Sequence, residues 1–166
     1  QRIGKTDAQL TEMSRTMPDS LNVEELLFAA TLTTDLNEQL RIYKEGERVH
    51  PTDHRAANNV GYIYMLQNKL DEANTQFTKA NSILDNPIST NNQGVVARLK
   101  GDRKKASELF AKANAAGPEV KYNQGLIDIQ NGNYSSASSN FGSTKSVNAA
   151  LAKLLGGDAA GAQSIL

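Results

Sequence analysis

Hydrophobic and small residues recur along this chain in pairs of helix-length segments. The stretch 58–80, NNVGYIYMLQNKLDEANTQFTKA, has apolar side chains at helical spacing on both sides of a polar break at 67–69. This pattern predicts two short amphipathic helices, over 58–66 and 71–83, that are joined by a tight turn. Three small residues and one large aromatic complete the pattern: Gly61, Ala73, Ala80 and Phe77.

The same order of residues recurs twice further along the chain, in 91–113 and in 122–141. The equivalent small and aromatic residues are Gly94, Ala106, Phe110 and Ala113, followed by Gly125, Ala137 and Phe141. Self-similarity at a period near 34 residues is typical of solenoids built from helical hairpins. Because Gly and Ala let two helices approach closely, we expect the three phenylalanines to fill the space between successive hairpins.

This spacing resembles the tetratricopeptide repeat, TPR. The resemblance rests on a small residue at the eighth place, Gly-Asp or similar at the turn, Ala at the twentieth, an aromatic at the twenty-fourth, a small residue at the twenty-seventh and Pro near the end. It implies an all-α fold, an α-α superhelix in the form of a right-handed TPR solenoid with about four to five helical hairpins. The predicted repeats cover 20–53, 54–86, 87–117, 118–142 and 143–166, and we expect the incomplete last repeat to continue in a longer chain.

Capping signals and glycines predict where individual helices begin and end. Thr6 with Gln9 has the form of a capping box, so residues 1–19 are predicted to hold a capping helix that covers the first repeat. Asn22 with Glu25 has the same form and predicts a helix from there to about residue 33. Two glycines predict helix ends, one as the C-cap of the third repeat and one in the fourth: Gly117 and Gly142.

Composition narrows the classes of function. The chain has 18 basic and 18 acidic residues, so it offers no large positive field for nucleic acid. Cysteine is absent, which excludes disulfides and thiolate metal sites, and no apolar run is long enough to cross a membrane. Asparagine is frequent, and in this respect the composition resembles that of repeat domains of bacterial cell-envelope proteins. We expect a periplasmic or cell-envelope location if a signal peptide has been removed, and a cytoplasmic one otherwise.

Residues that suggest catalysis or metal binding have simpler explanations. His50 and His54 are four apart, but Pro51 places them in the linker between repeats instead of on one helix face. The stretch 156–161, GGDAAG, lacks phosphate-loop spacing and predicts a helix-to-helix turn. The basic run 103–105 predicts a solvated helix face. We therefore expect no enzyme activity, no cofactor and no metal site.

A row of asparagines is the best candidate for a binding surface. The sixth place of successive repeats carries Asn59, Asn92, Asn123 and Asn148. In the TPR fold that the sequence resembles, the first helix of each hairpin lines the concave surface, and an Asn amide there can both donate to and accept from a peptide backbone. The alternative is that these amides only satisfy polar groups of neighbouring repeats.

Other residues of the same predicted face extend the candidate groove. We expect four of them to be exposed: Tyr62, Met65, Arg98 and Tyr122. Leu66 and Leu99 share this face, but we expect them to pack against adjoining helices. The Lys and Arg residues with which some TPR families hold a C-terminal carboxylate are missing at the second, fifth and sixth places.

Two functions remain open on these grounds. The first is a protein–protein interaction scaffold that binds a peptide segment or a partner protein in its concave groove, without nucleic acid and without insertion into a membrane. The second is a structural spacer or docking domain, without a ligand of its own, within a larger cell-envelope protein or assembly.

Overall fold

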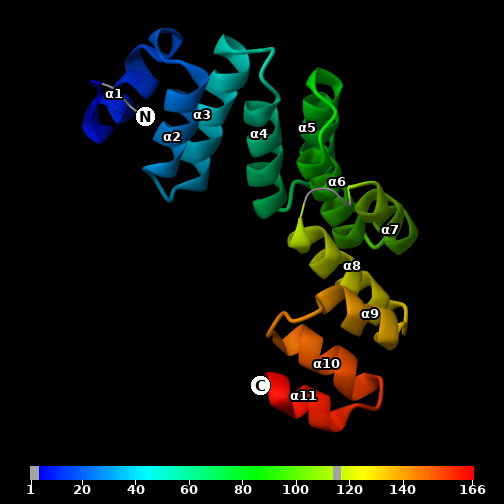
Figure 1. Ribbon diagram of the computed structural model, residues 1–166. Coiled ribbons are helices and arrows are strands. Elements are labelled where there is room, and N and C mark those ends of the chain that lie inside the picture. Colours follow the sequence, from blue (N-terminus) through cyan, green and yellow to red (C-terminus); the bar gives the residue numbers. More distant parts are fainter. Residues whose placement is uncertain (1–3, 114–116) are drawn as a thin grey trace. The chain divides into compact units, whose positions relative to one another are not determined.

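The computed structural model describes residues 4–113 and 117–166. Residues 1–3 of the predicted capping segment and 114–116 of the third predicted repeat lie outside the described part. Within that part the chain forms α-helices and one short 3-10 turn and contains no strand (Figure 1). It divides into two compact units, residues 1–89 and 90–166, which we call the first and the second unit.

The first unit holds an opening helix and two helical hairpins. The opening helix is α1 (Asp7–Thr16), followed by the 3-10 turn η1 (Pro18–Ser20). The hairpins pair α2 (Val23–Thr31) with α3 (Leu36–Val49), and α4 (His54–Leu66) with α5 (Leu70–Ile83). The next helix, α6 (Pro87–Leu99), begins with proline, which is pre-organised for a first helical position.

The second unit continues with the same alternation of helices. Most of α6 lies in this unit and is followed by α7 (Arg103–Lys112). Two further hairpins pair α8 (Pro118–Gln130) with α9 (Tyr134–Phe141), and α10 (Val147–Leu155) with α11 (Ala159–Ile165). The all-α prediction and the expected number of hairpins are confirmed. We call α2, α4, α6, α8 and α10 the first helices of their hairpins.

The opening helix begins at the predicted capping box and packs against the first hairpin. Thr6 Oγ1 accepts from the Gln9 backbone N–H at 3.1 Å, and the Thr6 N–H donates to Gln9 Oε1 at 2.8 Å. Leu10 is fully buried in one cluster with Leu26 of α2 and Ile42 of α3. Thus α1 covers apolar surface that the first hairpin would otherwise expose to water.

The glycines of the repeat mark a close approach of two helices, as predicted. A Cβ atom added to Gly61 would lie 2.7 Å from Cε1 of Phe77, and one added to Gly94 would lie 2.5 Å from Cε1 of Phe110. Gly125 and Phe141 form the third such pair. In each pair both residues belong to one hairpin, so the expectation that the rings sit between successive hairpins is incomplete. The rings first fill the space within their own hairpin.

Left-handed residues close the turns within the hairpins. Residue φ angles of +60° to +91° occur at four equivalent places: Asn68, Gly101, Gly132 and Gly157. Such a conformation costs an L side chain energy and suits glycine, with asparagine as the next most tolerated residue. The predicted turn in the glycine-rich stretch 156–161 is therefore confirmed.

Some predicted helix boundaries were wrong. The helix α4 begins at His54, so His54 is a helical residue and only His50 precedes the helix. Gly117 is not the C-cap of the third repeat, because α7 ends at Lys112 and Gly117 is the N-cap of α8 with φ +123°. Gly142 ends α9 as predicted, with φ +55°.

The second unit buries a carboxylate among neutral donors. Asp128 of α8 accepts from Ser136 Oγ at 2.9 Å and from Asn140 Nδ2 at 2.7 Å, both on α9. The other carboxylate oxygen of Asp128, Oδ1, lies 3.4 Å from Gln124 Nε2, which is also 3.1 Å from Ser107 Oγ of α7. This network joins α7, α8 and α9, and it satisfies a charge that would be costly to bury without partners.

Candidate functional site

A pocket in the first unit contains one of the predicted ligand-binding asparagines. It has a volume of about 250 Å³, and its lining combines apolar and polar side chains from α2, α4 and the start of α6: Leu27, His54, Arg55, Asn58, Asn59, Asn86 and Ile88. Leu27 is half-buried and Ile88 is exposed. The pocket thus combines two apolar side chains with three amides and two basic side chains, a composition that suits the side chain and backbone of a peptide.

The Asn59 amide has unused hydrogen-bonding capacity in this pocket. It is half-buried, and no other side chain or backbone group of residues 4–113 and 117–166 forms a hydrogen bond with it. An amide can donate two hydrogen bonds and accept two. The neighbouring Asn58 differs, since its Oδ1 accepts from the buried Ser89 hydroxyl at 2.9 Å. Asn59 is therefore the member of the pair that can serve a ligand.

Ion pairs fix the charged side of the pocket. The Arg55 guanidinium donates to both oxygens of Glu24, at 2.8 and 2.9 Å, and to both oxygens of Asp53, at 2.8 and 3.0 Å. Hydrogen bonds from Arg55 lower the pKa of the Asp53 carboxyl, against the opposing effect of burial. Because two carboxylates already hold it, Arg55 is a rigid wall of the pocket and a poor anchor for an incoming acid.

The asparagines of the second unit are used between neighbouring first helices. Asn123 Nδ2 donates to Oδ1 of the buried Asn91 at 3.1 Å, and Asn148 Nδ2 donates to the Tyr122 hydroxyl at 2.9 Å. Each bond joins the fifth place of one repeat to the sixth place of the next. This is the arrangement that the alternative interpretation of the asparagine row expects, although each amide keeps further donor and acceptor capacity. Asn92 is half-buried and also has an interaction within the chain.

The remaining predicted groove residues differ in exposure. Tyr62 is exposed, whereas Met65, Arg98 and Tyr122 are half-buried. The ring of Tyr122 packs edge-on against Phe141, with the centroids 5.1 Å apart. Arg98 has a buried Nε atom without a hydrogen-bond partner among the described residues.

The expectation for Leu66 and Leu99 was wrong. They are 51% and 48% exposed, so adjoining helices do not bury them. Both residues end their first helix directly before the turn, where the chain bends away and leaves the last side chain uncovered. Two further leucines of the candidate surface are therefore available to a partner.

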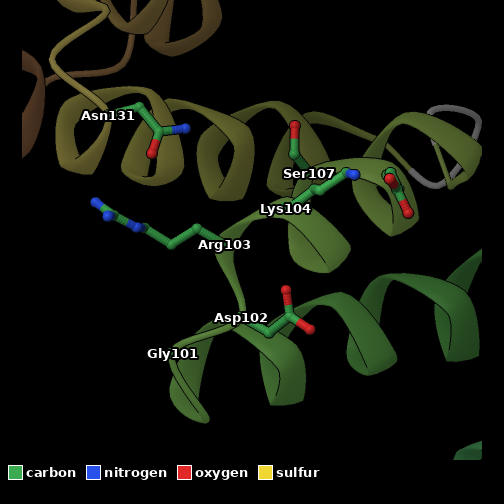
Figure 2. Close-up of a pocket in the computed structure, with 7 residues that line it drawn as sticks. Gly101, Asp102, Arg103, Lys104, Ser107 and Asn131 are labelled. Carbon is green, nitrogen blue, oxygen red and sulfur yellow. The ribbon is translucent and has the colours of Figure 1, made fainter.

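The basic run 103–105 is solvated, as predicted, and borders an open polar pocket of about 610 Å³ (Figure 2). The pocket lies at the start of α7, with Asn131 from the end of α8 on its rim (Figure 2). A guanidinium nitrogen of Arg103 donates to the Gln130 carbonyl oxygen at 2.6 Å. Since a cation is favourable at a helix C-terminus, Arg103 stabilises the end of α8.

The two histidines have different positions, since His50 follows α3 and His54 begins α4. His50 Nε2 lies 2.8 Å from the Leu21 carbonyl oxygen, which indicates that Nε2 carries the ring proton. No cluster of three metal-ligating side chains occurs in the described ranges 4–113 and 117–166. In the same ranges no helix combines the length and the apolar character that a membrane span requires.

Two features of the site escaped sequence reasoning. The pocket around Asn59 depends on Leu27 and Ile88, which lie on two other helices and about 30 residues away on either side. Leu27 occupies the eighth place, where the other repeats have Gly or Ala, and this departure from the repeat was the available signal. The hydrogen bond between Asn91 and Asn123 had no such signal in the sequence, because asparagines at the same places of other repeats could pair in the same way.

Comparison with known proteins supports the fold. No family model matches the chain. The BBSome complex member BBS4 of Bos taurus is 28% identical over 108 residues, which cover 63% of this chain and 21% of that protein. Among solved structures, a chain of the APC/C hetero-tetramer Cut9-Hcn1 has a TM-score of 0.80 at 14% identity, covering 96% of this chain and 35% of that one.

Two smaller proteins show the same likeness. The type IV pilus biogenesis factor PilW has a TM-score of 0.78 at 16% identity, with 95% of this chain and 80% of that chain covered. A tetratricopeptide repeat protein from Parabacteroides merdae has a TM-score of 0.64 at 25% identity, with 86% and 63% covered. The chain therefore has a TPR fold, a class that generally serves as a protein interaction scaffold. It spans about a fifth of BBS4 and about a third of the Cut9-Hcn1 chain.

Proposed function

We propose that this chain is a protein interaction scaffold that binds a peptide segment of a partner protein along the exposed face of its first helices. The observation that carries the proposal is the Asn59 pocket, where an amide with unused hydrogen-bonding capacity shares the lining with the apolar side chains of Leu27 and Ile88. A bound peptide would place one apolar side chain between Leu27 and Ile88, and its backbone would pair with the Asn59 amide. We expect an affinity in the micromolar range, which is about −8 kcal/mol.

The other predicted groove residues would contribute to a lesser extent. Tyr62 and Met65 follow Asn59 on α4 at helical spacing and offer apolar contact area. Asn92, Asn123, Asn148, Arg98 and Tyr122 would form the corresponding surface of the second unit. Because Asn123 and Asn148 already hold neighbouring helices together, we expect their replacement to lower stability as well as binding.

The experiment compares two asparagines of the first unit. Short linear peptides are selected on the protein from a phage library, and the affinity of the enriched peptides is measured by fluorescence anisotropy. Asn59→Ala is expected to weaken binding about tenfold, which corresponds to one or two lost backbone bonds. The matched control is Asn74→Ala, which removes a half-buried amide from the second helix α5. Equal loss in both variants, or none in either, would refute the proposed role of Asn59.

The alternative function is a structural spacer or docking domain of a larger assembly. The bonds Asn91–Asn123 and Tyr122–Asn148 favour it for the second unit, since they use the asparagine row to join helices. If no peptide is enriched on the protein, and the partner's affinity is unchanged by substitutions at Asn59 and Tyr62, the spacer explains the chain better.

A further inference from the structure

One turn of the second unit contains a chemically labile dipeptide. Asn131 is the one asparagine of the sequence that is followed by glycine, Gly132. Both residues are exposed, and they lie in the turn between α8 and α9. The backbone nitrogen after an asparagine can attack the carbon of the side-chain amide, and glycine hinders this attack least because it has no Cβ atom. The corresponding turn of the second repeat has Asn68 followed by Lys69, whose side chain hinders it more.

The reaction hydrolyses the side-chain amide in two balanced steps. The Gly132 nitrogen forms a bond to Cγ of Asn131 while the bond from Cγ to Nδ2 breaks, and the displaced proton and the amide group leave as ammonia. A five-membered succinimide ring remains, and one water molecule opens it. Opening at Cγ gives aspartate. Opening at the main-chain carbonyl carbon gives isoaspartate, in which the main chain runs through Cβ and Cγ.

The folded turn makes this reaction depend on local opening. The Gly132 N–H donates to the Ile129 carbonyl oxygen at 3.0 Å, and Asn131 has nearly helical angles, with φ −89° and ψ −3°. Ring closure requires a different ψ, so this hydrogen bond must break first. The bond lies at the end of α8 between exposed residues, and such helix ends open at a low free-energy cost. The rate at Asn131 therefore reports how often the turn opens.

The two products differ in what they do to the turn. Aspartate leaves the main chain unchanged and places a carboxylate in the polar pocket that Arg103 also lines (Figure 2). Isoaspartate adds one carbon to the main chain. Two hydrogen bonds span the added carbon: Gly132 N–H to Ile129 at 3.0 Å, and Asn133 N–H to the Asp128 carbonyl oxygen at 2.8 Å. A longer main chain cannot keep both bonds in their present geometry.

We propose that Asn131 is a site of spontaneous modification, where deamidation to isoaspartate loosens α9 from α8. The turn aligns α9 so that two of its side chains donate to the buried carboxylate of Asp128. When the turn is lengthened, these donors lose their alignment and the packing of α9 weakens. This site lies in the second unit and is independent of peptide binding at the Asn59 pocket.

The first experiment measures where deamidation occurs. The full chain is incubated at neutral pH and digested with trypsin, and mass spectrometry follows the peptide 122–145, which also contains Asn133 as an internal control. We expect conversion at Asn131 to be at least about tenfold faster than at Asn133, which precedes tyrosine. The free peptide should react faster still, because it has no folded turn to open. Equal rates at the two asparagines, or an intact Asn131 in the folded chain after the free peptide is fully converted, would overturn the proposal.

The second experiment measures the effect on α9 by hydrogen exchange. Asn131→Gln is the matched control, because it keeps an amide but cannot form the five-membered ring. Fresh Asn131→Asp supplies the carboxylate with an unchanged main chain. We expect the amides of α9 to exchange severalfold faster in the aged chain than in aged Asn131→Gln or fresh Asn131→Asp. Equal exchange in the aged chain and aged Asn131→Gln would overturn the proposal, as would the same acceleration in fresh Asn131→Asp, because the charge alone would then explain it.

Discussion

Replacing Gly61 by alanine tests the physical basis of the hairpin. The added Cβ would lie 2.7 and 2.8 Å from two ring atoms of Phe77 and 3.1 Å from the Ala73 carbonyl oxygen. Phe77 is fully buried, so its ring cannot turn into solvent to relieve the contact. The helix must move, or the ring must leave its preferred rotamer.

Two opposing terms set the expected magnitude. Alanine in a helix interior is favoured over glycine by about 1 kcal/mol. Overpacking of a close-packed core costs about 1–3 kcal/mol. The contact at Gly61 is shorter than Cβ contacts normally are, so the second term is the larger one. We expect Gly61→Ala to lower the free energy of unfolding by about 1 kcal/mol.

The assay measures the same substitution in two backgrounds. Urea unfolding is followed by circular dichroism, and hydrogen exchange of α4 and α5 locates the change. In a Phe77→Leu background the ring atoms are gone, so Gly61→Ala should become neutral or stabilising. A change of sign between backgrounds is the signature of the Gly61–Phe77 contact. Destabilisation of equal size in both backgrounds would refute the reasoning.

Three further predictions follow from single contacts. Asp128→Ala should lower the free energy of unfolding by about 2 kcal/mol, because two donors on α9 lose their acceptor, while Asp128→Asn should cost less; urea titration distinguishes them. Asn68→Gly should raise Tm slightly, whereas Asn68→Ala should lower the free energy of unfolding by about 1 kcal/mol. The reason is that the φ angle of Asn68 is +60°, which glycine adopts more easily than alanine. Hydrogen bonds from Arg41 lower the pKa of Glu38 from 4.5 to about 2. The contribution of the Glu38 carboxylate to the free energy of unfolding is therefore complete above about pH 4.5 and is lost as the pH falls toward 2. Glu38→Gln should remove about 1 kcal/mol of that pH dependence, measured as the difference in unfolding free energy.

The fold could be predicted because the same pattern of small and aromatic residues recurs in successive repeats. Gly61, Gly94 and Gly125 each face a phenylalanine of their own hairpin, and three occurrences in register are hard to produce by chance. Boundaries such as Gly117 were less predictable. A glycine between two helices can end one or precede the next, and here α7 already ends at Lys112, so Gly117 precedes α8.

The candidate site could be predicted only in part. The sequence identified Asn59 by its place in the repeat, but not Leu27 and Ile88, since the three meet only when α2, α4 and α6 are assembled. It did not reveal that Asn123 bonds to Asn91, because the same spacing fits an amide that faces a ligand. Exposure of Leu66 and Leu99 was missed because helical spacing assigns a face and does not show where the neighbouring helix ends.

A hydrogen-exchange footprint of a selected peptide on the full chain tests the central claim most directly. The peptide to use is one whose binding Asn59→Ala weakens. When it is bound, we expect new protection of backbone amides from exchange in α2, in α4 and at the start of α6, the three segments that line the Asn59 pocket. Protection confined to α3 and α5, the second helices of the first unit, would contradict the account.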